Sequence, residues 1–164
     1  MKAKEITLSA LLTALTIIIL YLNLLLPIST ISILTLASLL IPIALIRGSM
    51  KSAILVYISS SIIGLFLLPI NIIILYILFF GIYGLVKYFI EKFNNMPLEI
   101  LLKIIFFNII LFISFFVFKS FIAIEITKLP IGIFWIIAQI VFLVFDYALS
   151  LLITFYIEKI HKKI

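Results

Sequence analysis

Six long apolar stretches, separated by short polar or proline-containing breaks, follow one another along the chain. A helix that spans a bilayer needs about 20 mostly apolar residues, because each residue rises about 1.5 Å across a hydrocarbon core of about 30 Å. By this measure we predict membrane-spanning helices over residues 6–26, 31–46, 53–68, 70–86, 98–118 and 131–157. The second, third and fourth are short, so we expect them either to stand nearly upright or to include one partly re-entrant segment.

The composition agrees with this pattern. The chain has 164 residues, of which 67% are hydrophobic and 11% charged, and its mean hydropathy is +1.52. Such values are typical of an integral membrane protein. No internal repeat and no polar segment long enough for a soluble domain interrupts the apolar pattern. We therefore predict an all-α polytopic membrane protein whose six transmembrane helices form a single domain over residues 1–164.

Several kinds of chemistry are excluded by residue counts. The chain has no cysteine, which excludes disulfides, thiolate metal sites and cysteine nucleophiles, and its one histidine, His161, cannot build a histidine metal site. It also has no carboxylate pair, no Ser–His or Ser–Lys dyad with a suitable base, and no phosphate-binding glycine loop. We expect neither a cofactor nor an enzymatic activity.

The basic residues indicate the orientation. With six crossings, all of the 12 basic residues except Lys119 and Lys128 fall on the side of the N-terminus. The positive-inside rule makes this side cytoplasmic, so we predict a multi-pass protein of the cell (cytoplasmic) membrane with both termini in the cytoplasm. The net charge of +6 is accounted for by this placement, and the lipid bilayer rather than nucleic acid is the expected partner.

Polar residues recur on one face of each of the last two predicted helices. Asp146 is the one carboxylate deep in a span, and burying it charged costs about 2.5 to 3.5 kcal/mol on insertion scales. At about 100° per residue, spacings of four, seven and eleven keep side chains on one face of a helix. Such spacings relate Trp135, Gln139, Phe142 and Asp146 in the sixth helix, and Asn108, Phe112, Phe115 and Lys119 in the fifth.

If these two faces meet, they form a substrate-binding site. Asn108 and Asp146 then make a polar floor near mid-membrane, the aromatic rings make a wall, and Lys119 makes a cationic rim towards the outside. A small organic ligand would stack on Trp135 or a neighbouring ring and form a hydrogen bond with Gln139.

Each of these residues also has a structural interpretation. Asn108 and Asp146 could be interhelical contacts worth about 0.6 to 2 kcal/mol. Lys119 could extend to the outer interface, and Trp135 could belong to the interfacial aromatic belt. The sequence leaves both interpretations open.

Two alanines in the first span form a second candidate site. Ala10 and Ala14 lie four residues apart, so on a helix they share a face and leave a shallow strip where another helix can pack closely. Apart from Asn23, this helix carries little interior polar chemistry. We predict a partner-docking surface, and the alternative is packing against another helix of the same chain.

The same stretch carries a resemblance to a known family. The segment Lys4-Glu-Ile-Thr-Leu-Ser-Ala-Leu-Leu-Thr-Ala-Leu15, with its Ala10-xxx-Ala14 spacing, resembles the first helix of substrate-binding S components of energy-coupling factor (ECF) transporters. The block over residues 47–69 is similar to their second and third helices through Gly48, Tyr57, Gly64 and Leu68-Pro69. No vitamin-specific set of ligand residues matches, so the substrate stays open.

The resemblance implies a six-helix S-component bundle that captures a vitamin or related micronutrient on the outer side. It also implies that Ala10 and Ala14 dock on a T subunit and that a pair of partner ATPases hydrolyses ATP. Two alternatives remain: a structural membrane protein similar to the rod-shape factor MreD, and an S-component-like regulator that has lost transport. An acidic residue expected after the third-span glycine of the MreD family is missing here, which disfavours the first.

Overall fold

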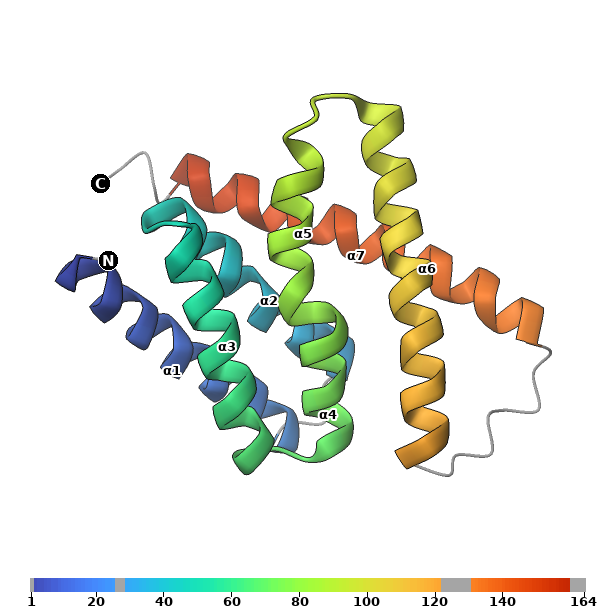
Figure 1. Cartoon of the computed structure of the whole chain (residues 1–164), viewed down its shortest axis with the longest axis horizontal. Coiled ribbons are helices and arrows are strands. Elements are labelled where there is room, and N and C mark those ends of the chain that lie inside the picture. Colours follow the sequence, from blue (N-terminus) through green and yellow to red (C-terminus); the bar gives the residue numbers. More distant parts are fainter. Residues whose placement is uncertain (1, 26–28, 122–130, 160–164) are drawn as a thin grey trace. The chain divides into compact units, whose positions relative to one another are not determined.

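The computed structural model describes residues 2–25, 29–121 and 131–159, and every regular element in these ranges is helical. The first three helices are α1 (Ala3–Leu25), α2 (Thr30–Arg47) and α3 (Met50–Leu67). One continuous helix then consists of α4 (Ile70–Leu75), the π-helical turn η1 (Tyr76–Phe80) and α5 (Gly81–Glu91). Two long helices follow, α6 (Met96–Phe121) and α7 (Ile131–Lys159) (Figure 1).

Six of these helical segments are long and apolar enough to cross a membrane. Their ends lie within a few residues of the predicted ones, except that the fourth segment continues to Glu91, five residues beyond the predicted end at residue 86. The prediction of an all-α polytopic membrane protein with six spans is confirmed.

The chain divides into two compact units, Met1–Asn95 and Met96–Ile164. The first contains α1 to α5 and the second contains α6 and α7. The prediction of a single domain stays a prediction, and each unit is described by itself below.

In the first unit, α2 is the central helix, since it packs against α1, α3, η1 and α5. Its apolar residues Ala37, Ile41 and Ala44 are fully buried. The buried Pro42 meets Gly84 of α5 so closely that a Cβ on this glycine would lie 2.8 Å from the proline Cδ. Glycine is therefore required at position 84 by the close approach of two helices.

Hydrogen bonds from α3 support the π-helical turn. Tyr57 donates its hydroxyl to the carbonyl of Ile77 over 2.9 Å, inside the turn. Ser60 donates to the carbonyl of Val56, and its oxygen lies 2.8 Å from the hydroxyl of the fully buried Tyr76. A π turn widens the helical ladder, and these side chains give its polar groups partners that lipid does not offer.

The second unit consists of two helices joined by aromatic and polar contacts. Figure 1 shows α7 running across α6. Phe107 of α6 and Phe142 of α7 are both buried, and their rings stack with centroids 4.4 Å apart and planes 7° from parallel. This stacked pair lies in the sequence between the two polar contacts described in the next subsection.

A test of the α2–α5 contact is Gly84→Ala. The added methyl group meets the rigid proline ring, so we expect a lower thermal stability, by about 1 to 3 kcal/mol for overpacking. Gly132→Ala in α7 is the matched control, because a Cβ there meets nothing within 4 Å. Thermal unfolding in detergent, followed by circular dichroism, measures both, and equal melting temperatures for the two variants would contradict the packing.

Candidate binding site on helices α6 and α7

Asn108 is the centre of a hydrogen-bonded cluster that joins α6 to α7. Its Oδ1 accepts from Nε1 of Trp135 over 3.1 Å and from Nε2 of Gln139 over 2.9 Å. Its Nδ2 donates to the backbone carbonyl of Ile104, one turn earlier in α6, over 2.8 Å. Trp135 and Gln139 are four residues apart, so α7 presents both to the same asparagine. The structure thus brings together three of the residues that the sequence singled out.

The orientation of the Asn108 amide follows from its partners. An indole N–H can only donate and a backbone carbonyl can only accept, so Oδ1 must face Trp135 and Nδ2 must face Ile104. Gln139 therefore uses its nitrogen towards Asn108. All three side chains are half-buried and neutral.

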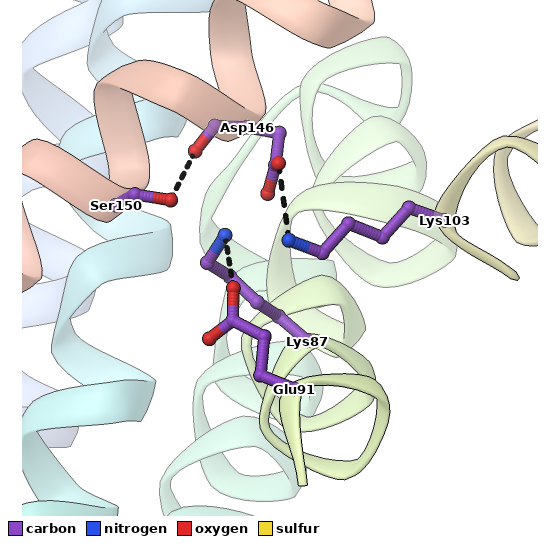
Figure 2. A network of polar contacts seen from close by, with 5 residues as sticks. All are labelled: Lys87, Glu91, Lys103, Asp146 and Ser150. Atoms are coloured by element: carbon purple, nitrogen blue, oxygen red, sulfur yellow. Dashed lines mark hydrogen bonds and ion pairs between the residues drawn. The ribbon is translucent and has the colours of Figure 1, made fainter. Parts of the chain in front are cut away.

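Asp146 is held elsewhere, by an ion pair with Lys103. The Lys103 ammonium lies 3.2 Å from Oδ2 of Asp146, and their side chains are 10% and 19% exposed (Figure 2). Ser150 donates its hydroxyl to the backbone carbonyl of Asp146 over 2.9 Å. Asp146 and Asn108 are predicted to form one polar floor, but the structure places them in two separate contacts. The two contacts lie at different levels of α6, because Lys103 and Asn108 are about 7.5 Å apart along the helix axis.

Lys103, the partner of Asp146, could not be recognised from its helical face. It was counted only as a basic residue on the N-terminal side, although it lies within the predicted span over 98–118. A lysine inside a span requires a partner just as an aspartate does, and this shared requirement was the available signal.

The remaining predicted parts of the site are less closely connected. The rings of Phe112 and Phe115 both contact Phe116, with centroids 4.9 and 6.2 Å apart. Lys119 belongs to α6, but its side chain lies outside the described residues, so the cationic rim stays a prediction. In the described ranges, no group of three His, Cys, Asp or Glu residues could hold a metal ion.

A further ion pair, between a buried lysine and an exposed glutamate, lies in α5. The ammonium of Lys87 is 2.8 Å from Oε1 of Glu91, one turn later, and the lysine side chain is only 3% exposed while that of the glutamate is 42% exposed (Figure 2). The sequence analysis placed Lys87 just beyond the fourth span, but the helix continues to Glu91. The carboxylate of Glu91, at the end of the helix, therefore neutralises the buried ammonium of Lys87 one turn earlier.

The predicted docking residues line an open groove in the first unit. Ala10 and Ala14 are exposed and, together with residues of α3 such as Leu55 and Ile63, form the walls of a groove of about 540 Å³ between α1 and α3. The groove is apolar except for a few hydroxyl groups. One of these belongs to Thr13, which is 6% exposed.

Comparisons with protein-family models, with curated proteins and with solved structures find no match for this chain.

The Lys103–Asp146 pair can be tested by a double-mutant cycle. Lys103→Met leaves the carboxylate without this ammonium, and Asp146→Leu leaves the ammonium without this carboxylate, so each is expected to cost about 3 to 5 kcal/mol of stability. The double variant should cost less than the sum of the two, because no unpaired charge remains. Unfolding in detergent measures this, with the exposed Glu158→Gln as control, and additive costs would show that the pair contributes nothing.

The Asn108 cluster can be followed by fluorescence, because Trp135 is the only tryptophan of the chain. Asn108→Leu removes the acceptor of the indole N–H, so we expect the emission maximum to move to shorter wavelength. Asn23→Leu in α1 is the matched control and should leave the emission unchanged. An unaltered spectrum in the Asn108 variant would mean that the indole is not bound there.

Proposed function

We propose that this protein is the substrate-capturing S component of an ECF-type importer for a vitamin or related micronutrient. It would lie in the cytoplasmic membrane with both termini in the cytoplasm, where the basic residues concentrate. A T subunit and a pair of ATPases would supply the energy of transport, and this chain would bind the small-molecule substrate.

The observation that carries the proposal is the open groove along Ala10 and Ala14. Elsewhere in the first unit, Gly64, Gly81 and Gly84 are each covered by a side chain of another helix. Both alanines are instead exposed, and they face an apolar groove between α1 and α3. Small residues that leave a groove open on a membrane helix favour close approach by a helix of another subunit.

The Asn108 cluster supports the capture of a substrate. It supplies neutral polar groups and an indole ring on α6 and α7, the composition that is usual for pockets that bind small organic molecules. The Lys103–Asp146 pair, on the cytoplasmic side of this cluster, would stabilise the packing of α6 against α7 without taking part in binding. Intramembrane polar groups are more often functional than those of soluble cores, which favours this assignment.

The docking role is tested with Ala10→Leu and Ala14→Leu. Because both alanines are exposed, the added side chains fill the groove without disturbing the core, so we expect loss of co-purification with a co-expressed T subunit and ATPase pair while the chain stays folded. Leu11→Phe is the matched control, since Leu11 is 62% exposed and does not line the groove.

Unchanged co-purification of the alanine variants would remove the docking assignment. If cell-shape proteins co-purify instead and no transporter subunit does, the chain is a structural membrane protein and the proposal is wrong.

A further inference from the structure

Gln139 retains a hydrogen-bond acceptor that the protein does not use. Its Nε2 must face Asn108, because the oxygen of that asparagine is already fixed by the indole of Trp135. Its own Oε1 then accepts no hydrogen bond from any residue in the described ranges. An unused carbonyl within a membrane-spanning helix is unfavourable in lipid, so this oxygen is available to a group from beyond the described residues.

Gln139 and Asn108 keep hydrogen-bond donors and acceptors that the contacts within the cluster do not use. Gln139 keeps Oε1 as an acceptor and one of the two hydrogens of Nε2 as a donor. Asn108 likewise keeps one hydrogen of Nδ2, since the other is donated to Ile104. A carboxamide that offers an acceptor and a donor side by side pairs with a complementary donor and acceptor on a planar partner, as Asn and Gln do with adenine.

The charge of the surroundings restricts the ligand further. The hydrogen bonds of Asn108, Trp135 and Gln139 involve neutral groups alone, and the nearest described charges along these helices, Lys103 and Asp146, are paired with each other. A charged group brought to the cluster would lose its hydration without gaining a counter-ion. An uncharged group with the same hydrogen-bonding edge avoids this cost.

We propose that the site takes an uncharged, planar heterocycle that carries an N–H next to a carbonyl or ring nitrogen, such as a cyclic amide, a ureide or an aminopyrimidine. Its N–H donates to Oε1 of Gln139, and its acceptor receives a hydrogen from Nε2 of Gln139 or Nδ2 of Asn108. The indole of Trp135, one turn from Gln139, offers a surface on which such a ring stacks. This inference rests on the proposed function and names the substrate class of the same site.

The test uses the small molecule that stays bound to the full chain through mild purification. Native mass spectrometry detects it, and fragmentation after extraction identifies it. The identified compound is then titrated onto ligand-free wild type, Gln139→Met, Gln139→Glu and the control Thr154→Val, which alters an exposed residue of α7. Trp135 fluorescence reports whether each variant keeps the bond between the indole and Asn108.

We expect the compound to be an uncharged planar heterocycle with the adjacent donor and acceptor. Its affinity should fall by about tenfold or more in Gln139→Met, as for the loss of one or two neutral hydrogen bonds, and remain unchanged in Thr154→Val. Gln139→Glu keeps an acceptor but loses the donor and adds a charge, so it should also bind more weakly.

Two results separate the possible failures. A retained compound that is charged or lacks this edge, or one whose affinity is the same in both Gln139 variants and wild type, overturns the substrate class and leaves the proposed function intact. A chain that retains no small molecule overturns the inference, and if the same preparation also binds no T subunit, it overturns the proposed function as well.

Discussion

A polar side chain inside a bilayer must find its hydrogen-bond partners within the protein or in a ligand, because lipid offers none. In the second unit this constraint is met twice along α6, by the neutral groups around Asn108 and by the ion pair of Lys103 with Asp146. The two contacts differ in chemistry: the ion pair neutralises its charges, whereas Oε1 of Gln139 accepts no hydrogen bond from the part of the chain that the structure describes. This difference is why we propose that the cluster, and not the ion pair, binds the substrate.

The first unit meets a different constraint, which is the close packing of helices without a hydrophobic driving force between them. Glycines allow this close packing in the interior, since Gly84 contacts Pro42 and Gly81 contacts the ring of Tyr57 at distances that leave no room for a Cβ. The alanines of α1 have the same small size but lie in an open groove. Small residues thus serve internal packing at some positions, while at Ala10 and Ala14 they line an open groove, where we propose that a partner docks.

The spans could be predicted from the sequence because length and hydropathy alone decide them, and the spacing of Trp135 and Gln139 correctly placed both on one face of α7. The partner of Asp146 could not be predicted in the same way. Helical periodicity tells which residues share a face, but the crossing of α6 and α7 decides which levels meet, and it brings Lys103 rather than Asn108 to the aspartate. The π turn at Tyr76–Phe80 could not be predicted either, because nothing in its largely apolar sequence indicates the hydrogen bond from Tyr57.

The central claim is that Oδ1 of Asn108 accepts hydrogen bonds from both Trp135 and Gln139. This arrangement orients the Gln139 amide so that its Oε1 is available to a ligand. The single tryptophan allows a direct measurement, because the indole N–H gives one resonance in a nitrogen–proton correlation spectrum of the protein in detergent. Our account predicts a downfield, hydrogen-bonded proton that moves upfield in Asn108→Leu and keeps its position in Asn23→Leu. An indole resonance at the position of a free N–H in the wild type, unaffected by the Asn108 substitution, would contradict it.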